Sequence, residues 1–285
     1  MDVTFWGVRG SIPTSSHETV RYGGHTSCVC VRVEGGPPLV FDMGTGARLL
    51  GKALRAEGVE KVYVAMSHTH VDHMMGLPYF EPIFDLSCDV HMGFPASSSA
   101  EARERVGRYL NGIFHPLNLA DLGSNLKFHG VPSGETIRVG PYTLSTIRLV
   151  HPGGTLGYRV SVGERSMCYL TDTGPLAQPG EGLMAGKGPT KMEAELLDFA
   201  SQTDLMVMDT CFDQDQYHHH LSWGHAYPEY AVAVGEAAGV KEVVLFHHNP
   251  DASDDSLDAL AKKWAAHSSP TVSLAKEGRV VSLEG

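Results

Sequence analysis

Four residues of the types that bind metal ions lie close together in the segment SHTHVDH, residues 67–73: His68, His70, Asp72 and His73. Side chains at i and i+2 of an extended segment point to the same side, so His68 and His70 can approach one ion together. Imidazole nitrogens and carboxylate oxygens are ligands of zinc and of other divalent metals. Because buried polar groups need partners, so dense a run directly after an apolar segment indicates a metal site.

Further residues of the same types follow other apolar runs. His151 follows TIRLV, Asp172 follows CYLT, His247 follows VVLF and Asp42 follows LVF. Catalytic and binding groups collect beyond the C-terminal ends of strands, so these segments can build one site from distant parts of the sequence. With Asp42 set aside, five histidines and two carboxylates remain, which is enough to hold two divalent ions with water in the open positions.

The elements that position these side chains are predicted from hydrophobic periodicity and turn residues. Strands are expected at 2–8, 27–33, 38–44, 61–70, 156–163, 165–174, 204–212, 241–250 and 279–285, with two more within 135–151 around a turn at Gly140 and Pro141. Helices are expected at 47–58, 100–114, 193–202, 228–240 and 254–267, and the Gly- and Pro-rich segment 175–190 is expected to be a long loop. Strands come together early and alternate with helices late, which favours an α/β fold with two sheets between helical layers.

Composition excludes some classes of partner. The chain of 285 residues has a net charge of -11, which disfavours a broad basic face for a stable nucleic-acid partner. A small anionic ligand remains compatible, because a metal centre supplies its own positive charge. The N-terminus lacks a secretory pattern and no run reaches the roughly 18 apolar residues of a membrane span, so we expect a cytoplasmic protein with one domain over 1–285. The oligomeric state stays open, a homodimer included.

The five cysteines are Cys28, Cys30, Cys88, Cys168 and Cys211. An odd number at these spacings forms no disulfide framework, and several of the cysteines lie in apolar strand-like runs. We expect buried, reduced thiols that are not needed as metal ligands.

The run SHTHVDHMMGLP resembles the HxHxDH signature of the metallo-β-lactamase superfamily, and the later residues fall in that family's order. The resemblance implies an αββα sandwich in which two mixed sheets pack between helical layers. It also implies two metal ions, with Zn²⁺ expected first and Mn²⁺ or Fe as alternatives. By resemblance, the first ion is held by His68, His70 and His151, the second by Asp72, His73 and His247, Asp172 bridges both, and Asp42 supports the site from behind.

Two later segments resemble the phosphodiesterase branch of this superfamily, typified by ribonuclease Z and small-substrate cyclic phosphodiesterases. These are GHAYPEYAV with His225, and VMDTCF with Asp209. The resemblance implies that His225 stabilises the phosphate or protonates the leaving oxygen, that Asp209 orients His225, and that Asp72 also belongs to the catalytic set. Two ions would lower the pKa of a shared water toward about 7, and the resulting hydroxide would attack phosphorus.

Only 20 positions separate His151 from Thr171, which leaves no room for the long Gly-rich arm that grips transfer RNA in ribonuclease Z. The predicted substrate is therefore a small cyclic nucleotide or a nucleotide diester. The same metal cage also serves lactonases and thioesterases, so these remain alternatives, as does a non-enzymatic metal- or cofactor-binding protein.

Several other polar residues are assigned less directly. The run His218, His219 and His220 is expected in a solvated loop, with a place at the substrate entrance as the alternative. His248 is expected not to be a ligand, because neighbours on a strand point to opposite faces. For Arg9, the two alternatives are a contact to phosphate and a structural role. For Lys187, they are a contact to phosphate and exposure to solvent.

Overall fold

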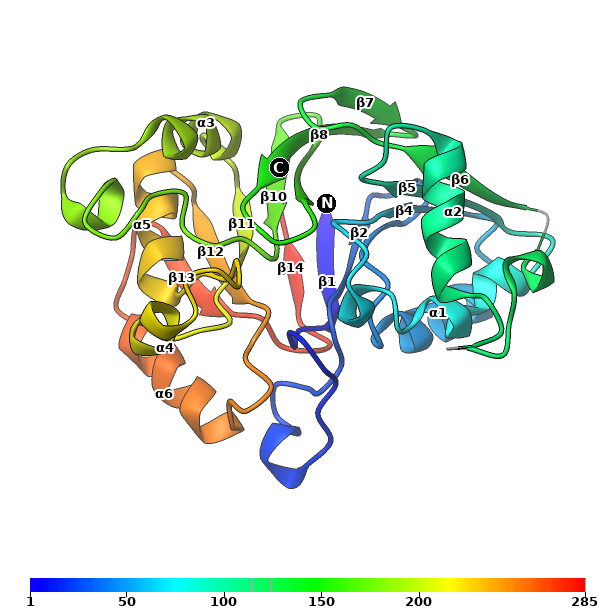
Figure 1. The fold of residues 1–285 in the computed structure, drawn as a ribbon, viewed down its shortest axis with the longest axis horizontal. Coiled ribbons are helices and arrows are strands. Elements are labelled where there is room, and N and C mark those ends of the chain that lie inside the picture. The colour runs from blue at the N-terminus through cyan, green and yellow to red at the C-terminus, as the bar shows by residue number, and fades with distance from the viewer. Residues whose placement is uncertain (114, 124, 285) are drawn as a thin grey trace.

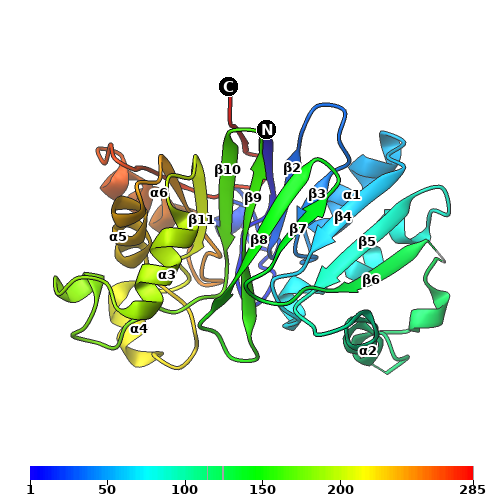
Figure 2. The same cartoon turned by 90° about the horizontal axis from the view of Figure 1, so that it is seen from above.

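The computed structural model describes residues 1–113, 115–123 and 125–284. Two seven-stranded sheets pack face to face, and helices cover the outer face of each sheet (Figures 1 and 2). The predicted αββα sandwich of two mixed sheets is confirmed. Phe114 and Gly285, at the ends of two predicted elements, lie outside the described residues.

The first sheet has the strand order β14-β1-β2-β3-β4-β5-β6. Its strands are β1 (Asp2–Gly7), β2 (Cys28–Arg32), β3 (Leu39–Phe41), β4 (Lys61–Ala65), β5 (Asp89–Phe94), β6 (Leu126–Gly130) and β14 (Val280–Ser282). The strands from β3 to β6 are parallel to one another. Helices α1 (Ala47–Ala56) and α2 (Ser99–Tyr109) cover its outer face.

The second sheet has the order β13-β12-β11-β10-β9-β8-β7. Its strands are β7 (Thr136–Val139), β8 (Tyr142–Leu149), β9 (Thr155–Val162), β10 (Arg165–Leu170), β11 (Leu205–Asp209), β12 (Glu242–Phe246) and β13 (Thr271–Leu274). The strands from β10 to β13 are parallel. The helices on this side are α3 (Lys191–Ala200), α4 (Gln214–His219), α5 (Pro228–Ala238) and α6 (Asp254–Trp264).

Strand β11 shows why the central segments are so apolar. Leu205 and Val207 pack into the layer between the two sheets, whereas Met206 and Met208 pack against the helices outside. Side chains alternate between the faces of a strand, so a strand covered on both faces needs apolar residues at every position. The continuous run LMVM is the result, and its burial supplies the hydrophobic stabilisation of both interfaces.

The polar residues that follow the strands gather at one edge of the sandwich. In the first sheet β1 runs in the same direction as β3 and β4, and in the second sheet β8 runs in the same direction as β10, β11 and β12. The two chain termini lie at the opposite edge (Figure 2). The C-terminal ends of these strands therefore meet where the SHTHVDH segment follows β4.

Among the strands and α-helices of the described residues, four were not predicted: β5, β6, β13 and the short helix α4. The segment 175–190 is a connection between β10 and α3 that contains only the 3₁₀ turn Leu183–Ala185, in agreement with its Gly and Pro content. All five cysteines are buried and unpaired. None of the described helices is both long and apolar enough to cross a membrane.

Candidate functional site

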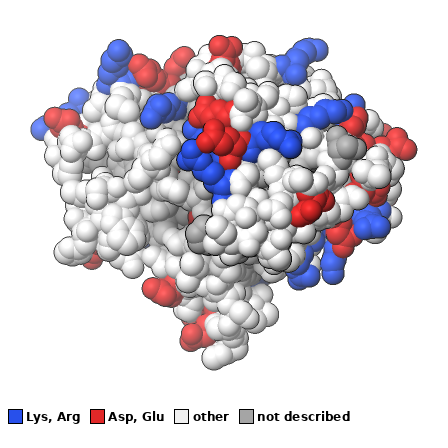
Figure 3. Space-filling view, turned by 45° about the vertical axis from the view of Figure 1, so that its right-hand side comes forward, with Lys and Arg blue, Asp and Glu red and all other residues white. Residues whose placement is uncertain are grey.

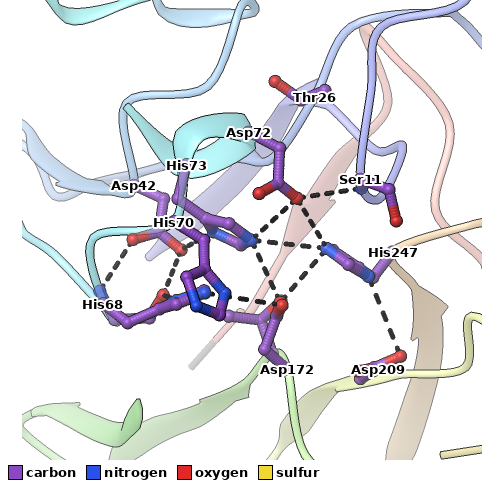
Figure 4. A network of polar contacts seen from close by, with 12 residues as sticks. Ser11, Thr26, Asp42, His68, His70, Asp72, His73, Asp172, Asp209 and His247 are labelled. Atoms are coloured by element: carbon purple, nitrogen blue, oxygen red, sulfur yellow. Dashed lines mark hydrogen bonds and ion pairs between the residues drawn. The ribbon is translucent and has the colours of Figure 1, made fainter. Parts of the chain in front are cut away.

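Side chains from four segments of the chain converge at the common edge of the two sheets (Figure 4). They form two overlapping groups whose nitrogen and oxygen atoms lie within 4.8 Å of one another, and each group could hold a metal ion. The first group is His68, His70, His151 and Asp172, and the second is Asp72, His73, Asp172 and His247. The structure thus brings together all seven residues predicted as ligands.

Asp172 lies between the two groups, and each of its carboxylate oxygens faces one of them. Oδ1 is 3.0 Å from Nε2 of His73 and 3.1 Å from Nε2 of His247. Oδ2 is 3.6 Å from Nε2 of His68 and 3.5 Å from Nε2 of His151. A carboxylate in this position can contact two ions at once.

The hydrogen bonds behind the histidines determine which ring nitrogen faces the centre. His73 donates from Nδ1 to Oδ2 of Asp42 at 2.8 Å, and His151 donates from Nδ1 to the carbonyl of Gly224 at 2.9 Å. A histidine that donates from Nδ1 presents the lone pair of Nε2 to a metal.

His68 is held in the same way by a short relay. The Ser67 hydroxyl donates to Asp42 at 2.7 Å, so its oxygen accepts from Nδ1 of His68 at 3.0 Å. Nε2 of His68 is then left buried, with no hydrogen-bond partner among the described residues. Lone pairs from several rings that converge on a carboxylate fit a cation, so the residues present suit the divalent ions that this fold implies.

Asp42 connects the two groups from behind, as expected of a supporting carboxylate. It is fully buried, and it accepts hydrogen bonds from the backbone N–H of Ser67 at 2.7 Å and from the hydroxyl of Tyr169 at 2.9 Å, besides those from the Ser67 hydroxyl and His73. Its carboxylate is fully satisfied by these donors, so it can hold His73 in one orientation.

Backbone strain is concentrated at the same edge. Of the five described non-glycine residues with positive φ, four belong to the site: Ser11, Asp42, Asp172 and His247. The left-handed region costs energy for residues with a Cβ, and it persists where surrounding contacts enforce it, often at functional sites. Ser11 is a residue that the sequence analysis missed, and its backbone N–H donates to Oδ2 of Asp72 at 2.9 Å.

The carboxylates make the centre electrostatically negative. Burial alone would lower the pKa of His73, but the charges of Asp172 and Asp72 outweigh burial and raise it well above the usual value. The pKa of His247 is raised to about 9 in the same way, against the effect of burial. Buried carboxylates need balancing positive charge, which protons or divalent ions can provide.

His225 and Asp209 form a hydrogen-bonded pair beside this centre. Nδ1 of His225 lies 2.7 Å from Oδ2 of the fully buried Asp209, which also accepts from the backbone N–H groups of Thr173 and Cys211. Burial lowers the pKa of His225, but the Asp209 carboxylate outweighs it and raises the pKa to about 9. The ring of His225 lies 5.0 Å from that of His151 and 5.2 Å from that of His247, between centroids.

Cys211 joins His225 and His247 in a third group of ligand-type atoms within 4.8 Å of one another. Its sequence context does not distinguish this cysteine from the other four. Burial raises the pKa of its thiol above the usual range. We assign it no function.

The other polar residues occupy structural positions. Arg9 is fully buried and donates to the carbonyls of Gly23, Asn249 and Ala252. Of its two alternative roles, the structural one therefore agrees with these contacts. His248 lies outside the three ligand groups and donates from Nε2 to the carbonyl of Ala275 at 2.8 Å. Lys187 donates to the carbonyl of Gly180 in the long loop.

The expectation of a loop at the histidine run is wrong, although His218 and His219 are exposed to solvent as expected. His218 and His219 form the last turn of α4, and His220 is its C-cap. A signal was present, because Asp213 and Gln216 form a capping box at the start of this helix. Because this helix is short and polar, it has no hydrophobic periodicity from which it could be predicted.

The family follows from comparison with known proteins. Residues 39–248 match the model of the beta-lactamase superfamily domain, so the chain belongs to that superfamily. Ribonuclease Z of Picrophilus torridus is 21% identical over 281 residues, which cover 90% of this chain and 88% of that protein.

Two solved structures show the same fold. The short form of human tRNase Z has a TM-score of 0.69 at 19% identity, with 100% of both chains covered. A diphosphatase from the PhnP family has a TM-score of 0.68 at 17% identity, with 99% of this chain and 98% of that chain covered. The predicted superfamily is confirmed. The relatives of this chain include ribonuclease Z, as the resemblance to that branch implied.

Proposed function

We propose that this protein is a metal-dependent phosphodiesterase that hydrolyses a small cyclic nucleotide or a nucleotide diester. The observation that supports it most is the pair of His225 and Asp209, joined at 2.7 Å and placed against the rings of His151 and His247. Hydrolysis of a diester needs a proton donor for the departing oxygen next to the centre that activates water.

In this proposal His68, His70 and His151 hold one divalent ion, and Asp72, His73 and His247 hold a second, with Asp172 shared. Bound there, the ions supply Lewis-acid stabilisation of the phosphate oxygens and an activated water. Zn²⁺ is the first expectation, and Mn²⁺ or Fe suit the same nitrogen and oxygen ligands. Asp42 orients His73 directly and His68 through Ser67.

His225 is the proposed general acid. The carboxylate of Asp209 accepts a hydrogen bond from Nδ1–H of His225, so Nε2 is the nitrogen left to donate a proton to the oxygen of the leaving group. The raised pKa of His225, about 9, keeps that proton in place at neutral pH. After the bond breaks, Asp209 stabilises the ring in the tautomer that can be protonated again.

The segment between the two halves of the site supports a small substrate. Of residues 152–171, all of them described, 155–170 form the hairpin of β9 and β10, whose turn lies at Gly163 and Glu164. No part of that segment is left for a projecting RNA-binding arm. On the face drawn in Figure 3, Lys and Arg are interspersed with Asp and Glu, and a broad part carries neither. Such a face offers few phosphate contacts to a long nucleic acid.

The test is a substrate screen on the metal-loaded protein and on His225→Ala. The panel contains cyclic mononucleotides, cyclic dinucleotides, 2′,3′-cyclic phosphates, precursor transfer RNA, a homoserine lactone and a thioester. We expect diester cleavage that falls by about 10²- to 10⁴-fold in His225→Ala, with metal content unchanged by elemental analysis. His219→Ala, at an exposed histidine of α4, is the matched control and should keep full activity.

Three results would contradict the proposal. Turnover of the lactone or thioester alone would identify the alternative hydrolases. Undiminished turnover by His225→Ala would remove the assigned role of this residue. Two bound metals without hydrolysis of any substrate in the panel would favour a non-enzymatic binding protein.

A further inference from the structure

An aromatic cluster borders the site on the side of His225, where the ring of Phe212 lies 5.6 Å from that of His225 between centroids. It consists of the exposed Trp223, the partly exposed His220 and the buried Phe212, and we call it the aromatic shelf. Trp223 is 58% exposed, although burial of an indole is strongly favourable. We propose that the aromatic shelf binds the planar base of the substrate by stacking on the indole of Trp223, an inference that rests on the proposed phosphodiesterase function.

The backbone ties Trp223 to the site. The next residue, Gly224, accepts the Nδ1 hydrogen bond of His151, and the residue after it is His225. Gly224 has a φ of +74°, and a Cβ there would lie 2.7 Å from the Cα of His151. This close approach requires glycine, so the position of Trp223 follows that of His151 and His225.

The rest of the shelf is also held by hydrogen bonds. The backbone N–H of Trp223 donates to the carbonyl of His220 at 2.9 Å, and Nδ1 of His220 donates to the carbonyl of Gln216 at 2.8 Å. The backbone N–H of Phe212 donates to the carbonyl of Ala226 at 3.2 Å, next to His225. A surface preorganised in this way loses little conformational entropy when a ligand binds.

Neither of the other two rings stacks in parallel on the indole of Trp223. Phe212 and His220 stack on each other with centroids 4.9 Å apart and an interplanar angle of 22°. Trp223 instead meets His220 at 76° and Phe212 at 62°, so neither ring lies parallel to it. None of the cation–π contacts in the described part of the chain involves Trp223. Trp264, by contrast, has Nζ of Lys263 at 5.5 Å from its ring centroid.

Neighbouring residues make the same edge apolar. Ile12 follows Ser11, Val71 precedes Asp72 and Val150 precedes His151, and these three side chains are exposed. Charge is thus concentrated in the centre, and apolar side chains flank it. A nucleotide has the complementary division, with an anionic phosphate and a flat, weakly polar base.

The experiment compares two ligands that differ only in the base. The probes are adenosine 5′-monophosphate and ribose 5-phosphate, measured by calorimetry on the metal-loaded protein. We expect Trp223→Ala to weaken the first by about 5- to 100-fold and to leave the second unchanged, from the usual contribution of base–aromatic stacking. Trp223→Phe should restore most of the difference, because it keeps an aromatic face.

Leu221→Ala is the matched control, since Leu221 is 48% exposed on the same loop but has no ring. It should change neither ligand. The turnover of adenosine 3′,5′-cyclic phosphate and of its abasic counterpart gives a second readout, in which Trp223→Ala should raise KM only for the nucleotide.

The inference would be overturned if Trp223→Ala weakened both ligands equally, or if the wild type bound both with the same affinity. It would also be overturned if the variant changed only the oligomeric state by sedimentation, which would make the shelf a contact between two copies of the chain. These failures differ from failure of the proposed function. Base-selective binding without turnover of any diester would contradict the phosphodiesterase alone, and turnover without base selectivity would contradict the shelf alone.

Discussion

The two ligand groups around Asp172 differ in solvent exposure and in charge. The first contains three histidines beside Asp172, and its His70 is exposed. The second contains two histidines and adds Asp72, and all of its members are buried. An ion in the second group would neutralise more buried negative charge and would be reached by less water, so the two positions should differ in affinity and in their effect on stability.

The largest effect is expected for Asp172→Asn, because this residue belongs to both groups. The substitution keeps the shape and removes the shared charge. We expect loss of metal from both positions by elemental analysis, and loss of diester turnover by about 10³-fold or more, since several kcal/mol of charge stabilisation disappear. Asp204→Asn, at a largely buried aspartate bonded to Ser166 and Lys241, is the control and should retain both ions. Retention of one full metal equivalent by Asp172→Asn would mean that the two groups are independent.

Asp42 and Ser67 offer a way to affect the groups separately. Asp42→Asn changes the acceptor of His73 directly, whereas Ser67→Ala removes the acceptor of His68 and one of the four donors to Asp42. Supporting contacts of this kind typically change metal affinity by about 10- to 100-fold. Titration with a competing chelator should therefore show that Asp42→Asn weakens mainly the second ion and that Ser67→Ala weakens mainly the first. The same pattern in both variants would show that Asp42 acts on the centre as a whole.

The pH dependence of kcat distinguishes the pair of His225 and Asp209 from the two ligand groups. A general acid must be protonated, so kcat should fall as pH rises through the pKa of His225, about 9, by about tenfold per unit above it. His225→Ala should show a low kcat without this alkaline limb, measured on the same diester from pH 6 to about 10. An alkaline limb that persists in the variant would assign it to another group.

The smallest effect concerns stability on metal removal. The ion of the exposed first group should leave first, and the unfolding temperature should fall mainly when the second ion leaves, by about 5 °C or more. Release can be followed with a metal-sensitive dye during chelation, and unfolding by calorimetry at each stage. Release in a single phase would contradict the proposed difference between the two positions. A fall in melting temperature confined to release of the first ion would reverse their assigned effects on stability.

Most strands were predictable because they are covered on both faces. β11 and β12 appear in the sequence as short continuous apolar runs, which few other structures require. β5 and β6 contain His91, His129 and Lys127 at positions outside the core, so their patterns are interrupted. β13 has only the four residues TVSL, too short for periodicity to distinguish from a loop.

The sequence by itself determined the fold family and the types of side chain at the site. Spacing within SHTHVDH is local, and residues at strand ends must meet where parallel strands end, so seven ligand-type residues could be named in advance. Only the tertiary structure decided which atoms face one another. Asp42 meets His73 over 31 positions, Gly224 meets His151 over 73, and Ser11 meets Asp72 over 61. These contacts depend on sheet register and strand crossing, which no local spacing encodes.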